Sequence, residues 1–259
     1  MFKFFEKKIR SNYFLYLSLI WIYKKFNFIF FFIEKNQFNF LKKINNNYKN
    51  FFILNIGSNH NQNCRIMLKI NPDFKIVNFD PNMPKLKNNE FKNFENVKNS
   101  NFGAFNKSIK KKLYIPYYKN FSLDSLSSLS KKNIRSYLNE HKLDVKKIHF
   151  KVKLCKFVKL DKFNYQTFFL KVDTEGSEID VLKGLNKTIK KHNPIILLEN
   201  NGYKNDKNVP QLKVIINYLK KFKYKSFYYE NNCFKKGSKN LNKRDLFFLN
   251  NNSFKYISK

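Results

Sequence analysis

The chain has 259 residues, enough for one ordinary domain with a buried core, so no second domain is required. Its formal net charge of +34 comes mainly from lysines spread along the sequence, and without a concentrated arginine-rich stretch this gives no reason to expect a nucleic-acid partner. Three separated cysteines and four histidines without HxH or HxxxH spacing predict neither a disulfide framework nor a metal site, and a reducing cytoplasm is the expected location.

Residues 1–45 are predicted to form an apolar and basic N-terminal helical extension. The apolar runs Tyr13–Tyr23 and Phe26–Ile33 are separated by Lys24 and Lys25. Because each lysine at the centre of a membrane-spanning helix costs about 2.5 to 3.5 kcal/mol, we do not expect a span. No small-residue cleavage site follows, as a signal peptide would require. We predict one or two helices packed on the main domain, with peripheral membrane contact as the alternative.

The main domain, residues 46–259, begins with the pattern of a strand, a glycine turn and a helix. Phe51–Leu54 is an apolar run of strand length, Asn55–Asn59 contains Gly57, and Cys64–Ile70 can be helical. A glycine in such a turn lets the backbone approach a ligand closely. An ordinary strand-to-helix connection is the alternative interpretation.

Asp80 and Pro81 directly follow the next predicted strand, Lys75–Phe79. An acid about 20 residues after a glycine turn, at the tip of the second strand, is placed to accept hydrogen bonds from the ribose hydroxyls of a nucleoside cofactor. The following segment, Asn96–Phe105, predicts a short third strand and the turn Asn101–Ala104. Asp80 is therefore the first choice for cofactor recognition.

Strand and helix signals continue on either side of residue 165. Leu113–Tyr117 and Ile148–Leu160 are predicted to be extended, and the second alternates apolar with basic residues. Phe168–Val172 and Ile195–Leu198 are apolar runs of strand length. Between those two strands a helix is predicted, because apolar residues recur at helical spacing at Ile179, Leu182, Leu185 and Ile189. Ser177 and Asp180 predict a capping box at the start of this helix.

The turn before this helix concentrates negative charge in a chain that has little of it. Four of the 18 acidic residues, Asp173, Glu175, Glu178 and Asp180, fall within eight positions. In an open parallel sheet, ligands bind beyond the carboxyl ends of the strands, where Asp173 and Glu175 would lie. For Glu178 and Asp180 we prefer compensation of the helix dipole.

The last part of the chain predicts one helix and two strands. Val209–Phe222 has helical apolar spacing, and Tyr224–Tyr229 and Leu246–Leu249 have strand character. Alternating strands and helices before Glu199 predict an α/β fold with a parallel sheet, and the terminal hairpin adds an antiparallel edge.

The segment LKVDTEGSEIDVLKG, Leu170–Gly184, resembles the signature of the FkbM family of S-adenosylmethionine-dependent methyltransferases. VKLDKF at Val158–Phe163, SSL at Ser127–Leu129, FDP at Phe79–Pro81 and the ILLE that ends at Glu199 are further similarities in the same order. The resemblance implies a Rossmann-like class I methyltransferase fold, with a mostly parallel seven-stranded sheet, helices on both faces and the C-terminal antiparallel hairpin. One departure is that Asn55 and Asn61 stand where the family's first glycine motif has an aspartate and a second glycine. An amide still accepts a hydrogen bond from the cofactor's ammonium, but without the charge that roughly doubles its strength.

The resemblance implies O-methylation of a hydroxyl on a saccharide or other small molecule, with S-adenosylmethionine as cofactor and no metal. We expect Asp173 or Glu175 to orient the acceptor hydroxyl or to take its proton. The residues assigned to cofactor binding are Asn55, Gly57, Ser58, Asp80, Pro81, Asn101, Ala104 and Asp173. Two alternatives stay open: an RNA methyltransferase on the same fold, and a catalytically inactive scaffold associated with a membrane.

Overall fold

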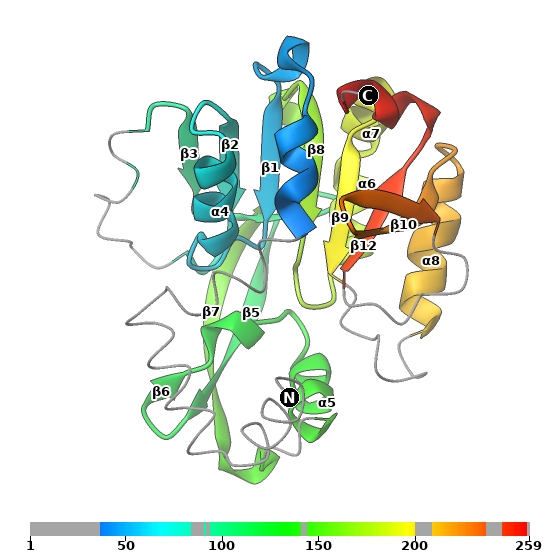
Figure 1. The fold of residues 1–259 in the computed structure, drawn as a ribbon. Coiled ribbons are helices and arrows are strands. Elements are labelled where there is room, and N and C mark those ends of the chain that lie inside the picture. Colours follow the sequence, from blue (N-terminus) through cyan, green and yellow to red (C-terminus); the bar gives the residue numbers. More distant parts are fainter. Residues whose placement is uncertain are drawn as a thin grey trace. The chain divides into compact units, whose positions relative to one another are not determined.

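The computed structural model describes residues 37–83, 91, 94–140, 144–199, 209–236 and 245–257, and the chain divides into two compact units (Figure 1). One unit comprises Gln37–Lys111 and Leu154–Lys259, and we call it the sheet unit. The described part of the other lies within Lys112–Lys153, and we call it the insert unit. Each unit is described by itself.

The sheet unit is built on a mixed sheet of eight strands. Their order is β11-β10-β12-β9-β8-β1-β2-β3. Strands β9, β8, β1, β2 and β3 are parallel neighbours, whereas β12, β10 and β11 add antiparallel pairs at one side. The strands are β1 (Phe52–Ile56), β2 (Lys75–Phe79), β3 (Val97–Ser100), β8 (Thr167–Val172), β9 (Ile195–Glu199), β10 (Lys225–Glu230), β11 (Cys233–Lys236) and β12 (Asp245–Leu249).

The prediction of a mostly parallel sheet of seven strands needs correction, because the sheet has eight strands and is mixed. The parallel half and the antiparallel pairing of β10 with β12 are confirmed. The segment between them contains a further strand, β11, which pairs with β10 through Tyr229 and Phe234. The sequence analysis predicted no strand here, because Phe234 is the only large apolar residue among the four residues of β11.

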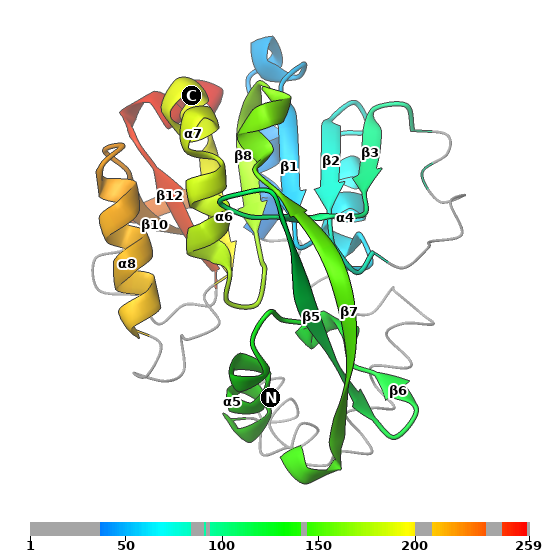
Figure 2. The ribbon, with the colours of Figure 1, turned by 180° about the vertical axis from the view of Figure 1, so that it is seen from behind.

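Helices cover both faces of the sheet (Figures 1 and 2). Helix α4 (Gln62–Ile70) lies on one face, and α6 (Glu178–Gly184), α7 (Asn186–His192) and α8 (Val209–Lys220) lie on the other. This double cover explains why all six residues of β8 are buried. The core beneath α6 to α8 includes Leu54, Val77, Leu170, Val181, Leu182, Ile196 and Leu219.

The predicted single helix after Asp173 is two helices that meet at Leu185. The break has a physical cause in the buried carboxylate of Asp161. Its oxygens accept hydrogen bonds at 2.9 Å from the backbone N–H groups of Lys187 and Thr188 and from the Thr188 hydroxyl. These are unpaired donors of the first turn of α7, so Asp161 starts a second helix there.

A second sheet has the strand order β4-β7-β5-β6. Its strands are β4 (Gly103–Ala104), β5 (Ile109–Tyr118), β6 (Phe121–Ser122) and β7 (Ile148–Val158), and the boundary between the two units falls within β5 and β7. The insert unit also contains α5 (Lys131–Glu140), whose Ile134 and Leu138 pack with Leu123 and Leu126 in a small buried cluster. Short 3-10 helices complete the described fold: Asn39–Lys43, Asn46–Tyr48, Asp124–Leu126, Val145–Lys147, Leu160–Phe163 and Asn251–Tyr256.

Most of the predicted extension, residues 1–36, lies outside the described residues. The part from residue 37 onward packs on the sheet face opposite α6, where Phe40 contacts the rings of Phe169 and Phe247 with centroid distances of 5.1 and 5.4 Å. Within the described ranges, no helix combines the length and the hydropathy of a membrane span.

Candidate functional site

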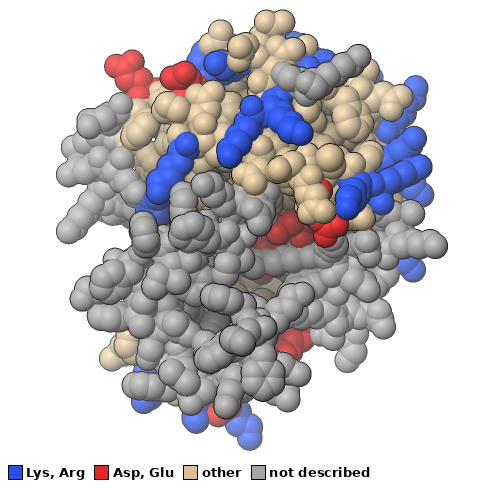
Figure 3. Space-filling view, viewed as in Figure 1, with Lys and Arg blue, Asp and Glu red and all other residues tan. Residues whose placement is uncertain are grey.

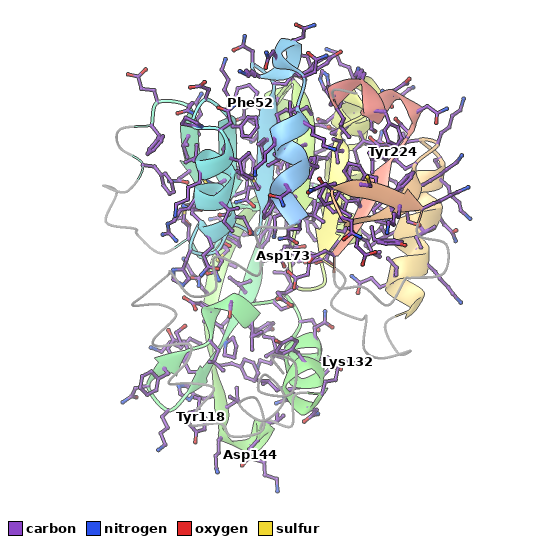
Figure 4. All side chains as sticks on the ribbon, viewed as in Figure 1. Phe52, Tyr118, Lys132, Asp144, Asp173 and Tyr224 are labelled. Atoms are coloured by element: carbon purple, nitrogen blue, oxygen red, sulfur yellow. The ribbon has the colours of Figure 1, made fainter. Side chains whose placement is uncertain are left out.

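The predicted site residues follow the carboxyl ends of three adjacent parallel strands. Ile56 at the end of β1 is in register with Phe79 at the end of β2 and with Val172 at the end of β8. Gly57, Asp80 and Asp173 therefore leave the sheet at the same level. Figure 4 labels Asp173 at this edge of the sheet unit, and in Figure 3 one group of acidic side chains lies near the middle of the view, others lie apart from it, and lysines are spread over the described surface.

Gly57 joins the two neighbouring strand ends to β1. Its N–H donates to the Phe79 carbonyl at 2.9 Å, and the preceding carbonyl, of Ile56, accepts from the Asp173 N–H at 3.0 Å. Gly57 has a φ of +77°, and a Cβ atom there would lie 1.6 Å from the Asp173 carbonyl oxygen. Only glycine fits, because the first turn and the β8 turn touch through their backbones.

Asp80 is held at the tip of β2 by backbone donors from both sides. Its two carboxylate oxygens accept from the N–H groups of Asn59 and Asn82, each at 2.8 Å. Loss of hydrating water raises the pKa of Asp80, the Asn82 and Asn59 N–H groups and the nearby His60 lower it, and the negative charge of Asp173 raises it further. The two acids are thus close enough to interact, and each Asp80 oxygen retains acceptor capacity for a further donor such as a hydroxyl.

Asp173 is partly exposed and is paired with a buried cation. The Lys171 ammonium lies 2.9 Å from Asp173 Oδ2, and the two side chains are 5% and 21% exposed. Lys171 was not among the predicted site residues. The signal that could have identified it is its spacing from Asp173, because residues two positions apart along an extended chain point to the same face.

Glu178 organises the β8 turn from inside. Its Oε1 accepts from the Thr174 N–H, the Thr174 hydroxyl and the Gly176 N–H, each at 3.1 Å, and its Oε2 accepts from Gln211 at 3.1 Å. Burial raises the pKa of Glu178, against the lowering effect of these backbone donors, and the charge of Asp173 raises it further. The interpretation of Glu178 as dipole compensation therefore missed its main role, which is to hold the turn that carries Asp173 and Glu175.

The predicted capping box at the start of α6 is wrong. The Ser177 side chain makes no capping hydrogen bond. The Asp180 carboxylate instead accepts from the Asn106 side chain at 2.5 Å. Glu175 lies in the same turn with a φ of +53° and is partly exposed, so the turn keeps this acid at the surface.

A row of hydrogen-bonded amides crosses the sheet beneath the first turn, buried at Asn55 and Asn78 and exposed at Asn99, and the sequence analysis did not predict it. Asn55, Asn78 and Asn99 occupy one register across β1, β2 and β3. Asn55 donates to Asn78 at 2.8 Å, Asn78 donates to Asn99 at 2.9 Å, and Asn61 donates to Asn99 at 3.2 Å. Aligning the ends of the predicted strands would have revealed the row.

The remaining predicted cofactor residues lie near the same edge in different environments. The Pro81 carbonyl accepts from the Cys155 thiol at 3.3 Å, and Asn101 is exposed. Ala104 is 3% exposed and belongs to the hydrophobic core. Its side chain thus packs inside the sheet unit.

A broad hollow at another part of the sheet unit is separate from these acids. Lysines and asparagines of α7, of the end of α8 and of the segments that follow α8 and β12 line it, among them Lys190, Lys220, Lys223 and Asn250. Of the described residues, neither an acid nor any predicted site residue lines it. Elsewhere, too, the described residues contain no cluster of three or more histidine, cysteine or acidic residues that could hold a metal ion.

Residues 45–226, well over half of the 259 residues, match the model of the methyltransferase FkbM domain. The chain belongs to the FkbM methyltransferase family. A crystal structure of methyltransferase FkbM from Methylobacillus flagellatus KT is similar, with a TM-score of 0.45 and 12% sequence identity. The similarity covers 77% of this chain and 43% of that chain, so this chain spans less than half of that protein's length. No curated protein matches the sequence.

The FkbM domain has unpaired polar atoms in its first turn that test the fit of the expected cofactor. Asn55 Oδ1, Ser58 Oγ and Asn61 Oδ1 are buried and have no hydrogen-bond partner among the described residues. Buried oxygen atoms in this condition favour any N–H or O–H donor that reaches them. An ammonium group is such a donor, and Asp80 offers acceptors for ribose hydroxyls, so the residues present fit S-adenosylmethionine. Asn55 and Asn61 have no exposed surface, so a donor reaches them only when the turn opens slightly.

Proposed function

We propose that this FkbM domain is an S-adenosylmethionine-dependent O-methyltransferase that methylates a hydroxyl of a saccharide or other small molecule. The observation that carries the proposal is the convergence of Asp80 and Asp173 on the two sides of the Gly57 turn, at the carboxyl ends of parallel strands. This is the position at which open α/β sheets bind ligands.

The residues divide into two tasks. Asp80 would hold the ribose, and the unpaired oxygens of Asn55, Ser58 and Asn61 would accept from the amino group. When bound, the cofactor supplies a methyl group on a positively charged sulfur. The protein must align an acceptor oxygen with that methyl group and provide an acceptor for the hydroxyl proton.

Asp173 and Glu175 are the carboxylates placed for the second task. Both lie in the turn that Glu178 holds, and both are partly exposed, so an acceptor hydroxyl can reach them from outside the sheet. A carboxylate in hydrogen-bond reach of the hydroxyl orients its oxygen and takes the proton as the new bond forms.

The proposal includes a small-molecule or saccharide acceptor and no nucleic acid. It also includes a cytoplasmic location, which is supported by the three cysteines, none of which is in a disulfide bond. Peripheral membrane contact through the N-terminal extension stays the alternative to helices packed on the main domain, and residues 1–36 of this extension lie outside the described ranges.

Transfer of a labelled methyl group onto total polysaccharide, lipid and RNA fractions tests the proposal. We expect label in a saccharide or small-molecule fraction, and about a 100-fold loss for Asp173→Asn, in the range that general acid–base groups contribute. The matched control is Asp73→Asn. It removes an exposed carboxylate of the sheet unit that lies before β2, at the opposite end of this strand from Asp80. Label mainly in RNA would support an RNA methyltransferase instead. Full activity in both Asp173→Asn and Glu175→Gln would show that the assigned acids are wrong.

A further inference from the structure

Lys171 occupies an unusual place for a lysine. It lies in β8, where all six residues are buried, and is 4% exposed. Its neighbours in register are Asn55 on β1 and Leu197 on β9. Phe169, two residues earlier on the same face, packs against Phe40 with a centroid distance of 5.1 Å. Lys171 thus lies on a face of the sheet where Phe169 is its aromatic neighbour and Asn55 is its polar neighbour.

Stability alone does not explain a cation at this position. A buried ammonium loses most of its hydration, and well-packed apolar residues often replace a buried ion pair with no loss of stability. Lys171 instead directs its ammonium to the edge of the sheet, where it lies 2.9 Å from Asp173 Oδ2. The cation is buried and its anion is partly exposed, so the pair presents a carboxylate to the site and keeps the cation behind it.

Asp173 also has negative neighbours that disfavour its charge. Asp80 reaches it from the tip of β2, and Glu178 reaches it from α6, since each of these acids interacts with Asp173. His60, in the turn after β1, acts on Asp80. Like charges at short range oppose one another's ionisation, whereas an opposite charge within about 4 to 6 Å favours it. Among the ion pairs of the described residues, Lys171 is the cation paired with Asp173, at 2.9 Å.

We propose that Lys171 is a positioning residue that keeps the Asp173 carboxylate ionised and fixed toward the carboxyl edge of the sheet. The proposal rests on the function proposed above, because it assigns Lys171 a role through Asp173. Lys171 itself does not touch the acceptor or the cofactor. Its removal would leave the Asp173 side chain less charged and without the ion pair that now fixes its direction.

The first test is a titration that needs no acceptor. Carbon-13 resonances of the aspartate carboxyl groups are followed with pH, and the Asp173 signal is assigned by its loss in Asp173→Asn. We expect this signal to titrate at higher pH in Lys171→Met than in the wild-type protein, because the neighbouring positive charge is gone. Lys75→Met, which removes a lysine of the same sheet at its opposite edge, should leave the signal unchanged. An identical Asp173 titration in Lys171→Met would overturn the proposal.

The second test is a double-mutant cycle on methyl transfer. We expect Lys171→Met to lower kcat about 30-fold with little change in KM, as displacement of an orienting group does. In the Asp173→Asn background the same change should cost less than about 3-fold, because residues that act as a unit are not additive. Lys171→Arg, which keeps a cation, should retain more activity than Lys171→Met. Lys171→Gln replaces Lys171→Met if the latter does not fold.

Failure of this inference and failure of the proposed function give different results. If Asp173→Asn is inactive while Lys171→Met is fully active, or if the two losses are additive, Lys171 does not act through Asp173. If no variant and no fraction shows methyl transfer but the Asp173 titration still shifts, the proposed function fails and the role of Lys171 stands.

Discussion

The two strand-to-helix turns at the site, after β1 and after β8, satisfy their polar groups in opposite ways. The turn after β8 is closed by Glu178, whose two oxygens accept four hydrogen bonds from Thr174, Gly176 and Gln211. The turn after β1 and the strand end before it contain Asn55, Ser58 and Asn61, each with a buried oxygen that lacks a partner among the described residues.

The β8 turn thus has its hydrogen bonds within the protein, whereas the β1 turn has buried oxygens that a bound ligand could pair. A fully bonded turn can hold Asp173 and Glu175 in place before any ligand binds, which is what a catalytic group requires. Unpaired buried oxygens are unfavourable until a donor arrives, so they favour a ligand with N–H groups. We infer that the β8 turn is built for chemistry and the β1 turn for binding.

The largest expected effect concerns the backbone contact that joins the two turns. Gly57→Ala would place a Cβ atom 1.6 Å from the Asp173 carbonyl oxygen at a φ of +77°. We expect it to lower the free energy of unfolding by about 4 kcal/mol, because strand β8 must shift or the turn must change its conformation. Urea unfolding measures this. Ser58→Ala is the control: it removes a hydroxyl that has no hydrogen-bond partner among the described residues and should change stability by less than about 0.5 kcal/mol. Equal, small effects of both substitutions would show that the two turns are not in contact.

The next effect separates the internal closure of the β8 turn from its charge. Glu178→Ala removes the acceptor of three donors in the turn, and we expect a loss of about 3 kcal/mol in the free energy of unfolding. Glu178→Gln keeps one carbonyl oxygen for those donors and should lose about 1 kcal/mol. Chemical denaturation of both variants at one pH measures the difference. If Glu178→Ala were as stable as the wild-type protein, Glu178 would not hold the turn.

The β1 turn can be altered toward the family's usual sequence. Asn55→Asp restores a carboxylate at the position where the family resemblance expects one, next in register to Lys171. We expect S-adenosylmethionine to bind about tenfold more tightly, because a charge-assisted hydrogen bond is about twice as strong as a neutral one. Calorimetry measures the affinity. Unchanged or weaker binding in a folded variant would indicate that Asn55 does not face the cofactor's ammonium.

The smallest effect is a pH dependence that belongs to the β8 turn. Burial raises the pKa of Glu178 above its ordinary value of 4.5. The native protein therefore keeps this proton to higher pH than the unfolded chain does, and between 4.5 and the raised native pKa stability falls as pH rises. Glu178→Gln should lose this part of the slope. Unfolding free energies measured from pH 4.5 upward decide it, and parallel curves for the two proteins would contradict the assignment.

Strand ends were the part of the molecule best predicted from the sequence. The predicted strand Lys75–Phe79 matches β2, and the position of Asp80 after it follows from the spacing to the Gly57 turn. The parallel order of β1, β2 and β8 then brings Asp80 and Asp173 to one edge. Local apolar runs and strand tips carry this information because each depends on a few neighbouring residues.

The features missed by the sequence analysis depend on contacts between distant segments. Asparagine is common throughout the chain, so nothing local marks Asn55, Asn78 and Asn99 as a row until three strands are in register. The split between α6 and α7 depends on Asp161, which is distant in sequence from the N–H groups that it accepts from. The role of Glu178 depends partly on Gln211.

Calorimetric titration with S-adenosylmethionine tests the central claim most directly, namely that the edge between the Gly57 turn and the Asp173 turn is the cofactor site. We predict saturable binding to the wild-type protein, about tenfold weaker binding to Asp80→Asn, whose ribose contact loses its charge, and unchanged binding to Asp73→Asn. No binding at millimolar cofactor, or equal binding to Asp80→Asn and the wild-type protein, would contradict the account.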